Sequence, residues 1–325
     1  MGRGDVGLDQ VVSGWRSEFR LAGPAGEPVD LRRVFLSHGL AALAPMRLLE
    51  DGQTFEITVP IPAGARTLSI GPGRAGFGVV EVAGRSPGAR LSATLLAQAR
   101  HVLSLDLDLS PFYALASEDP EMAWVTSGAG RMVRSPTVFE DVVKTICTTN
   151  TSWAGTTRMI NALIEHLGEK APGAPARGPY GRAFPTPAAM ASAGEDFYRS
   201  VAGAGYRAGY LRALATSVAE GSADLEALLA ARPDQISDQE VEEKLRALPG
   251  VGPYAAAHIM LMIGRYSRLI LDSWTRPTYA RLSGRRRPVS DGTIERRFRR
   301  YGRFAGLAFW LFLTRDWAED APGSG

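Results

Sequence analysis

The chain has 325 residues and a formal net charge of +3, with 45% apolar and 22% charged residues. This balance is typical of a globular protein and excludes a disordered or collagen-like chain. No apolar run approaches the roughly 18 residues of a membrane-spanning helix, and the opening residues lack the apolar core of a secretory signal. The single cysteine, Cys147, excludes an internal disulfide and a four-cysteine iron–sulfur or zinc site. We therefore expect a cytoplasmic protein without a membrane partner.

The N-terminal part of the sequence predicts a β-sheet. Residues 1–30 are polar and glycine-rich, and we expect no regular structure there. Between Val34 and Val82, the partly alternating segments TFEITVPI, RTLSI and FGVVEV are separated by glycine and proline turns. Such a series predicts an antiparallel sheet. Residues 91–103 then predict a helix.

From Ser135 onward the pattern is helical. Ser135 and Pro136 are a suitable cap and first turn for a helix over residues 137–149. Further helices are predicted over residues 156–167, 206–218, 224–229, 237–247 and 302–317, with a proline- and glycine-rich loop at 170–182. The predicted fold class is α+β, with a β-rich N-terminal domain over residues 1–125 and a helical domain over residues 126–325.

The turn LPGVG separates two of the predicted helices. Pro253 begins the second helix, at a position where its missing N–H loses no helical hydrogen bond. The turn's two glycines allow the backbone to turn tightly and to approach a ligand closely. The free N–H groups and the positive dipole end of the second helix suit a phosphate. The candidate phosphate-binding residues are Leu248, Gly250, Val251 and Gly252.

The basic residues are mostly arginine and are concentrated near the C-terminus. Only three of the 37 are lysines, namely Lys144, Lys170 and Lys244. Ten arginines lie between Arg276 and Arg303, against two acidic residues. A basic stripe after a phosphate-binding turn indicates a nucleic-acid partner, while a solvated face in an arginine-rich chain is the alternative.

The region from Ser135 to Trp317 resembles the helix-hairpin-helix superfamily of base-excision DNA glycosylases (HhH-GPD). The resemblance rests on LPGVG at residues 248–252, on Asp272 eighteen residues after Tyr254, and more weakly on AFPTPAAMA at 183–191 and GYRAGYL at 205–211. The β-rich part would correspond to the sheet domain (similar to the TATA-binding protein) of the 3-methyladenine glycosylase II and 8-oxoguanine glycosylase branches. The resemblance covers most of the chain.

The resemblance implies that Asp272 is the catalytic residue. Cleavage of an N-glycosidic bond develops positive charge on the sugar, and an ionised carboxylate beside the sugar stabilises that charge. Asp272 also precedes SWTRPTYARL, a plausible helix start, so it can be an N-cap as well. Some family members carry a lysine at the position of Tyr254, which forms a Schiff base before strand cleavage. The tyrosine therefore predicts a monofunctional glycosylase without lyase activity.

The family also implies residues that bind DNA and the extruded base. Asn150 matches a gap-filling asparagine, and Tyr206 and Arg207 match a tyrosine wedge and an opposite-base arginine. Arg276 belongs to the basic stripe. The expected base pocket consists of aromatic residues, with core packing as the alternative for each: Tyr254, Trp274, Trp153 and Phe309. For Trp310, core packing is the favoured interpretation. His258 and Cys147 are expected to pack between helices.

The pocket favours alkylated purines over oxidised guanine. Two 8-oxoguanine-branch positions depart from the pattern: Gly155 replaces an arginine and Phe309 a glutamine. Cationic bases such as 3-methyladenine and 7-methylguanine stack well on aromatic faces. Glycosylases for oxidised guanine or for mispaired thymine or uracil remain alternatives, as does a non-catalytic DNA-binding protein.

The expected partner is damaged double-stranded DNA, bound by a monomer that is nucleoid-associated if prokaryotic. We expect no cofactor and no side-chain metal site. The family implies only a possible monovalent cation, K⁺ or Na⁺, at the carbonyls of Leu248 and Val251.

Overall fold

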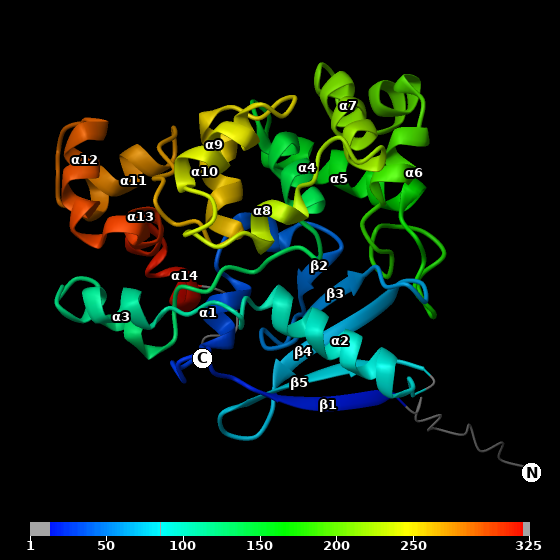
Figure 1. The fold of residues 1–325 in the computed structure, drawn as a ribbon, viewed down its shortest axis with the longest axis horizontal. Coiled ribbons are helices and arrows are strands. Elements are labelled where there is room, and N and C mark those ends of the chain that lie inside the picture. The colour runs from blue at the N-terminus through cyan, green and yellow to red at the C-terminus, as the bar shows by residue number, and fades with distance from the viewer. Residues whose placement is uncertain (1–13, 85, 321–325) are drawn as a thin grey trace, which may run out of the picture.

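The computed structural model describes residues 14–84 and 86–320 (Figure 1). A five-stranded antiparallel sheet is followed by a mostly helical chain, which confirms the predicted α+β class. The strands lie in the order β1-β5-β4-β3-β2. Their bounds are β1 Trp15–Arg20, β2 Met46–Leu48, β3 Phe55–Val59, β4 Arg66–Pro72 and β5 Phe77–Val82.

One face of the sheet is apolar and covered by helices. Phe55, Ile57 and Val59 of β3 alternate in sequence and are all fully buried. They share an apolar core with the helices α1 (Leu31–Phe35) and α2 (Ala89–Val102). The helix α2 runs across the sheet in Figure 1. Alternation of this kind is the pattern of a sheet with one covered face.

The start of the chain differs from the sequence prediction in two places. Residues 15–20 form the edge strand β1, paired in register with β5, although no regular structure was expected there. The expected β region began at Val34, but its first part is helical: residues 31–35 and 39–42 form two short helices. Asp30 caps the first of them by accepting the N–H of Arg33. Residues 1–13 of the expected irregular segment lie outside the described part of the chain.

The remaining described residues form helices joined by short loops. The longer helices are α3 (Ser110–Ser117), α4 (Val138–Thr148), α5 (Trp153–Leu167), α7 (Arg207–Ala219), α9 (Asp238–Arg246), α10 (Pro253–Met262), α11 (Thr275–Leu282), α12 (Asp291–Phe298) and α13 (Ala305–Thr314). The shorter ones are α6 (Pro187–Ser192), α8 (Glu226–Ala230) and α14 (Trp317–Asp320). The 3-10 segments Ala123–Ser127 and Arg299–Phe304 lie between them.

The predicted cap of α4 is wrong by two residues. Thr137, and not Ser135, accepts the N–H of Glu140 with its side chain and begins the helix. An N-cap side chain bonds to the N–H two or three residues later, which Thr137 does with Glu140, whereas Ser135 lies five residues before Glu140 and outside the helix. The N–H of Ser135 instead donates to the carboxylate of Asp141 at 3.2 Å.

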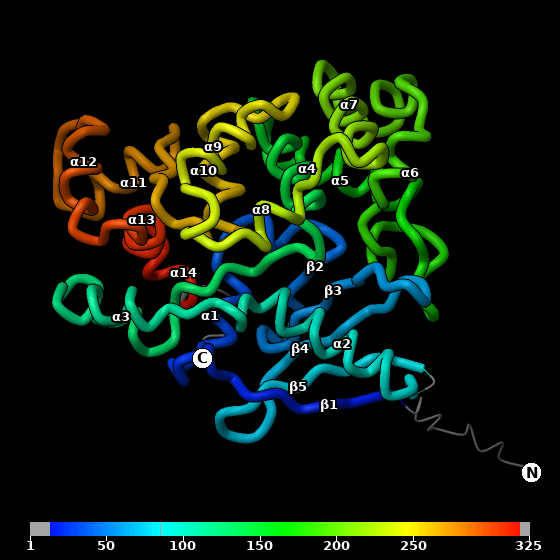
Figure 2. Tube along the Cα trace, in the orientation of Figure 1, coloured from blue at the N-terminus to red at the C-terminus, as the bar shows by residue number. Residues whose placement is uncertain are grey.

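The helix α10 separates two apolar cores and belongs to both. Ala255, Ala256 and Ile259 pack in the core of α4, α5, α7 and α9. Ala257 and Leu261 pack in the core of α3 and α11–α13. Burial on all sides makes α10 a fixed element, so that groups at its start are held rigidly. Figure 2 shows the chain passing from one side of α10 to the other.

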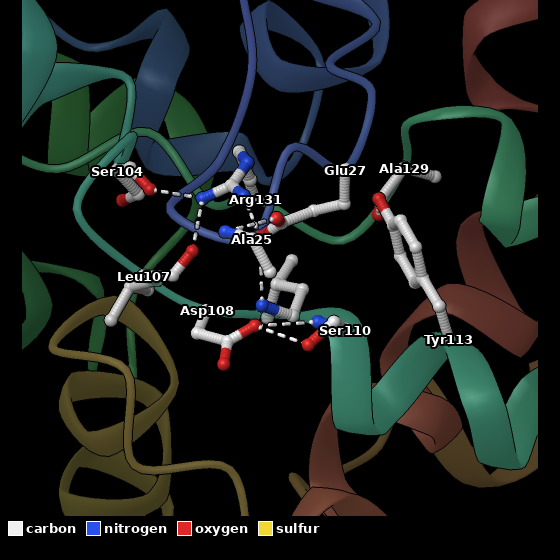
Figure 3. Close-up of polar contacts among 10 residues, drawn as sticks. Ala25, Glu27, Ser104, Leu107, Asp108, Ser110, Tyr113, Ala129 and Arg131 are labelled. Atoms are coloured by element: carbon white, nitrogen blue, oxygen red, sulfur yellow. Dashed lines mark hydrogen bonds and ion pairs between the residues drawn. The ribbon is translucent and has the colours of Figure 1, made fainter.

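Buried polar contacts join the sheet part to the helical part. The guanidinium of Arg131 is fully buried and pairs with Glu27 at 2.6 Å, while it also donates to the carbonyl oxygens of Ser104 and Leu107 (Figure 3). Glu27 in turn accepts the N–H of Leu109 at 3.0 Å. A buried charge is tolerated only when it is paired in this way.

The end of the chain returns to the sheet part. Arg32 of α1 donates to the carbonyl of Ala318 at 2.8 Å, and α14 packs beside α1 (Figure 1). Residues 110–127 pack with the C-terminal helices and not with the sheet. The domain boundary near residue 125 stays a prediction. Among the described residues, no helix is long and apolar enough to span a bilayer.

Candidate active site

The turn between α9 and α10 has the geometry of a helical hairpin. Gly250 adopts a φ of +80°, which is strained for any residue with a side chain. A Cβ on Gly250 would lie 2.8 Å from the ring of Tyr210, so the turn packs tightly against α7. Val251 is buried in the core and anchors the turn.

The start of α10 is open to a ligand. Gly252 is its N-cap and has no side chain to bond the first-turn N–H groups, which leaves the described start of α10 without a side-chain cap. Gly252 is exposed, and no described heavy atom beyond its chain neighbours lies within 4 Å of a Cβ built there. The dipole of a helix places positive charge at such an end. The turn can therefore bind a phosphate through its backbone.

The hairpin carbonyls retain capacity for a cation. The carbonyl of Leu248 accepts the N–H of Val251 at 3.2 Å, which leaves its second lone pair unused. The donor set fits a monovalent cation, which binds to oxygen. Among the described residues, no group of three or more histidine, cysteine or carboxylate side chains could hold a metal ion.

Asp272 lies after α10 and caps α11. One carboxylate oxygen, Oδ1, accepts the N–H groups of Trp274 and Thr275 at 2.8 and 2.7 Å. The hydroxyl of Thr275 accepts the N–H of Asp272 at 2.8 Å in return. Within the described part of the chain, Oδ2 accepts no hydrogen bond. The cap thus fixes the carboxylate with one oxygen and leaves the other available for chemistry.

Tyr254 lies within electrostatic reach of Asp272. Burial raises the pKa of the Tyr254 phenol, the hydroxyl of Thr148 lowers it by hydrogen bonding, and the Asp272 carboxylate raises it further. Because α10 is packed on both sides, the hairpin turn and Tyr254 at its start are held rigidly.

An aromatic cluster lies next to this pair. We define it as Tyr254, His258, Trp274, Trp310 and Trp317. Ring centroids are 5.8 Å apart for Tyr254 and His258, and 5.7 Å for His258 and Trp310. Trp274, Trp310 and Trp317 are mutually separated by 5.7–5.9 Å. Trp274 is 40% exposed, so the cluster extends from the surface to the buried ring of His258.

Two of the predicted pocket residues lie outside the cluster. Phe309 is fully buried among Tyr279 and Phe298 in the C-terminal core, a position that does not support a role in base binding. Its neighbour Trp310 joins the cluster instead and donates its indole N–H to Ser37 at 2.7 Å. Trp153 is 49% exposed and lies against Gly39.

The sequence analysis missed His258, Trp310 and Trp317 as site residues. His258 lies four residues after Tyr254 on α10, a spacing that places both on one helix face. This spacing was the available signal. Trp317 had none, because only the return of the chain to α1 brings it to the site.

A second group of exposed residues lies beside the hairpin. Asn150 has a φ of +47° and donates its amide to the hydroxyl of Tyr206 at 3.3 Å. Tyr206 is 54% exposed, and its ring stacks on the guanidinium of Arg207. Tyr210, which the sequence analysis did not single out, is 41% exposed and contacts both Tyr206 and the hairpin.

Two predicted DNA-binding arginines have partners within the chain. Arg207 is buried and donates to the carbonyl of Thr149. Arg276 forms a two-point ion pair with Asp291, at 2.7 and 3.0 Å.

The three lysines of the sequence differ in exposure. Lys144 is fully buried and paired with Glu140 at 2.6 Å, whereas Lys170 and Lys244 are exposed.

Solved structures share this fold. The 3-methyladenine DNA glycosylase from Archaeoglobus fulgidus matches with a TM-score of 0.69 and 20% identity, over 94% of this chain and 100% of that one. The 8-oxoguanine glycosylase/lyase of Clostridium acetobutylicum in its apo form matches with a TM-score of 0.65 and 21% identity, over 88% and 92%. The same enzyme in complex with double-stranded DNA that carries cytosine opposite 8-oxoguanine matches with a TM-score of 0.66 and 20% identity, over 90% of this chain and 93% of that one.

Comparison of the sequence alone gives no match, either to a protein-family model or to a curated protein. The likeness to the solved structures confirms the fold that the hairpin and its downstream acid predicted: the chain has the fold of helix-hairpin-helix DNA glycosylases.

Proposed function

We propose that the protein is a monofunctional DNA glycosylase that removes damaged bases, with alkylated purines such as 3-methyladenine and 7-methylguanine as its substrate class. The observation that carries the proposal is the joint placement of Asp272, Tyr254 and the open hairpin around α10. The hairpin binds a DNA phosphate, and the carboxylate lies where the sugar of an extruded nucleotide would be held.

The reaction is hydrolysis of the bond between C1′ of the sugar and the base nitrogen. The electron pair of that bond leaves with the base, and the sugar acquires oxocarbenium character. The Asp272 carboxylate stabilises this charge through Oδ2, while Oδ1 stays on the cap of α11. A cationic base leaves as a neutral molecule, water adds to C1′ and passes one proton to the solvent, and an abasic site remains.

The substrate class follows from the chemistry of the aromatic cluster. Trp274 is exposed and Tyr254 and Trp317 are half-buried, so these three rings can present faces to a base. Trp310 is buried, and its indole N–H is already bonded to the carbonyl of Ser37. Arg276 is paired to Asp291 and contributes no free charge to the cluster. A cationic alkylated purine gains from stacking on such faces, while a neutral base gains less. Tyr254 supplies no amine for a Schiff base, so cleavage of the strand is not expected.

A glycosylase for oxidised guanine is the second candidate. The likeness to the Clostridium acetobutylicum 8-oxoguanine glycosylase/lyase is nearly as close as the likeness to the 3-methyladenine enzyme, with TM-scores of 0.65 and 0.69. Removal of mispaired thymine or uracil is the remaining enzymatic alternative, and DNA binding without catalysis is the non-enzymatic one.

A panel of single-lesion duplexes tests the proposal. It contains 7-methylguanine, 3-methyladenine, 8-oxoguanine, and thymine or uracil opposite guanine, each assayed with and without alkali. We expect release of the methylated purines, strand breaks only after alkali, and at least a hundredfold loss of rate in Asp272→Asn. Unchanged release by Asp272→Asn contradicts the catalytic role, and DNA binding without release from any duplex contradicts the enzyme.

The proposed DNA complex is that of one protein chain with one duplex. The backbone of Leu248–Gly252 and the first turn of α10 bind the strand, and Asn150, Tyr206 and Tyr210 contact it beside the lesion. When bound, a K⁺ or Na⁺ at the carbonyls of Leu248 and Val251 would add positive charge next to the phosphate. Binding through phosphates is expected to weaken steeply with salt.

A further inference from the structure

His258 is the innermost ring of the aromatic cluster. It lies one helical turn after Tyr254 on α10, only 5% exposed, and its ring neighbours are Tyr254, Trp310 and His38 at 5.8, 5.7 and 6.3 Å. His38 meets it edge to face, with an interplanar angle of 88°. His258 therefore connects the aromatic cluster to His38, which lies outside the cluster.

Three of the four nitrogens of this histidine pair lack a partner. Neither ring nitrogen of His258 has a hydrogen-bond partner among the described residues, and neither does Nδ1 of His38. Nε2 of His38 lies 2.7 Å from the carbonyl of Val133 and must be the protonated nitrogen, which makes Nδ1 a lone-pair acceptor. A histidine used only for packing destabilises the folded protein when its ring nitrogens are buried without partners. Phenylalanine would fill the same space without that cost.

Both imidazoles are neutral in this environment. Burial, together with a smaller contribution from His38, lowers the pKa of His258 to about 3. Burial also lowers the pKa of His38 to about 4, with Lys144 as the nearby charge. A neutral imidazole has one N–H donor and one acceptor, so it can recognise a base without opposing a cationic one.

The position of the pair relative to Asp272 suits an extruded base. The N–H of Trp274 donates to Asp272 at 2.8 Å, and the Trp274 ring lies 5.9 Å from that of Trp310. Trp310 in turn lies 5.7 Å from His258, so the cluster connects Asp272 to the histidine pair. A base whose sugar lies at Asp272 and whose ring stacks among the aromatic residues would direct its far edge towards His258.

We propose that His258, supported by His38, recognises the hydrogen-bonding edge of the extruded base and sets the substrate specificity of the enzyme; this inference rests on the proposed glycosylase function. The acceptor on His38 and the donor and acceptor on His258 suit a purine edge that carries an amino or ring N–H group beside an acceptor nitrogen or oxygen. The tryptophans provide stacking, whereas the histidines distinguish one base from another.

The test compares His258→Phe and His258→Gln with the wild type on the same lesion duplexes. Phenylalanine keeps a ring in the cluster without nitrogens, and glutamine keeps one donor group and one acceptor. His166→Phe is the matched control, because His166 is exposed on α5 and contacts only Phe197 among aromatic rings of the described residues. Binding to a duplex with an abasic-site analogue, which requires the folded protein but no base, is measured for each variant.

We expect His258→Phe to lower kcat/KM for the preferred lesion at least tenfold more than for the poorest one, with partial recovery in His258→Gln and no change in His166→Phe. Binding to the abasic duplex should be retained. An active wild type whose relative rates are unchanged in His258→Phe overturns the inference and leaves the glycosylase function intact. If neither variant binds the abasic duplex, His258 is a packing residue and the inference is wrong. A wild type that releases no base overturns the proposed function itself.

Discussion

Asp272 combines a structural role and a chemical role in one side chain. Oδ1 holds the two N–H groups at the start of α11, and the chemistry is assigned to Oδ2. An asparagine can keep the cap through its carbonyl oxygen but has no negative charge. An alanine loses both functions. The two substitutions therefore separate folding from catalysis.

We expect the free energy of unfolding of Asp272→Asn to lie within about 0.5 kcal/mol of the wild-type value. That of Asp272→Ala should fall by about 1 kcal/mol, which is the typical effect of a lost N-cap. Both variants should lose base release. Urea unfolding and single-turnover release from the preferred lesion measure the two effects. Equal destabilisation of both variants would show that the carboxylate charge, and not the cap, stabilises α11.

Substitutions of the two hairpin glycines should separate an effect on stability from an effect on DNA binding. Gly250→Ala places a Cβ at a φ of +80° and 2.8 Å from the ring of Tyr210, so we expect a loss of about 1–2 kcal/mol in stability. Gly252→Ala has a φ of −90° and meets no described atom, so its stability should be unchanged. Its duplex affinity should fall at least fivefold, because the added methyl group obstructs the approaching phosphate.

Urea unfolding and duplex affinity at fixed salt check both glycine variants. If Gly252→Ala binds duplex as tightly as the wild type, the strand does not approach the backbone at this position.

Single residues of the sequence predicted the fold where the information was local. A glycine turn, a following proline and a downstream acid can be recognised in the chain, and the fold that they imply is confirmed. The aromatic cluster was predicted only in part. The resemblance placed Tyr254 and Trp274 in an aromatic pocket, but Trp310 and Trp317 come from segments that meet them only in the folded chain. The assigned roles of these residues stay predictions.

At the scale of elements, α4 carries a buried charge pair. Lys144 and Glu140 are fully buried and 2.6 Å apart, one helical turn from each other. Burial raises the pKa of Glu140, while Lys144 opposes that shift. Removing one member leaves a buried charge without its partner, which costs far more than the pair contributes.

We expect Lys144→Met to destabilise the protein by about 3–5 kcal/mol, since an uncompensated buried carboxylate has that cost. The double variant Lys144→Met with Glu140→Gln should recover more than half of the loss. Urea unfolding of the two variants and the wild type measures this coupling. A double variant as unstable as the single one would show that Lys144 contributes through packing alone.

Most helices were predictable because their apolar spacing and caps are local features. The capping box of Ser237 and Glu240, for example, begins α9 at the predicted place. Edge strand β1 was missed because WRSEFR is mostly polar and becomes a strand only by pairing with β5. The start of α4 was predicted two residues early because Ser135 and Thr137, on either side of Pro136, are both residues that commonly cap a helix.

At the scale of the whole molecule, the two parts meet through groups that sequence patterns do not reveal. Arg131 with Glu27, and the helix pair α1 and α14, join segments more than 100 residues apart. His38 of the N-terminal part also meets His258 of α10. The stability of the entire protein should therefore depend on the protonation of this buried histidine pair.

The sign of this dependence follows from the two histidines. An unfolded histidine titrates near pH 6.5, whereas burial lowers the pKa of His258 to about 3 and that of His38 to about 4. Their contribution to stability is full above pH 6.5 and is lost as the pH falls towards the folded values. Asp141 acts oppositely, because burial raises its pKa to about 7; its contribution is full below about pH 4 and is lost as the pH rises through 7.

Comparison with a variant isolates the histidine contribution from that of Asp141. Between pH 7.5 and pH 5 a buried neutral histidine loses about 2 kcal/mol of stabilisation. We therefore expect the free energy of unfolding of His258→Phe to rise by about 2 kcal/mol relative to the wild type over that interval, while exposed His166→Phe follows the wild type. Urea unfolding at both pH values measures the difference. Parallel behaviour of the wild type and His258→Phe would mean that folded His258 takes up a proton over the same pH range as an unfolded histidine. A charged His258 would repel a cationic base.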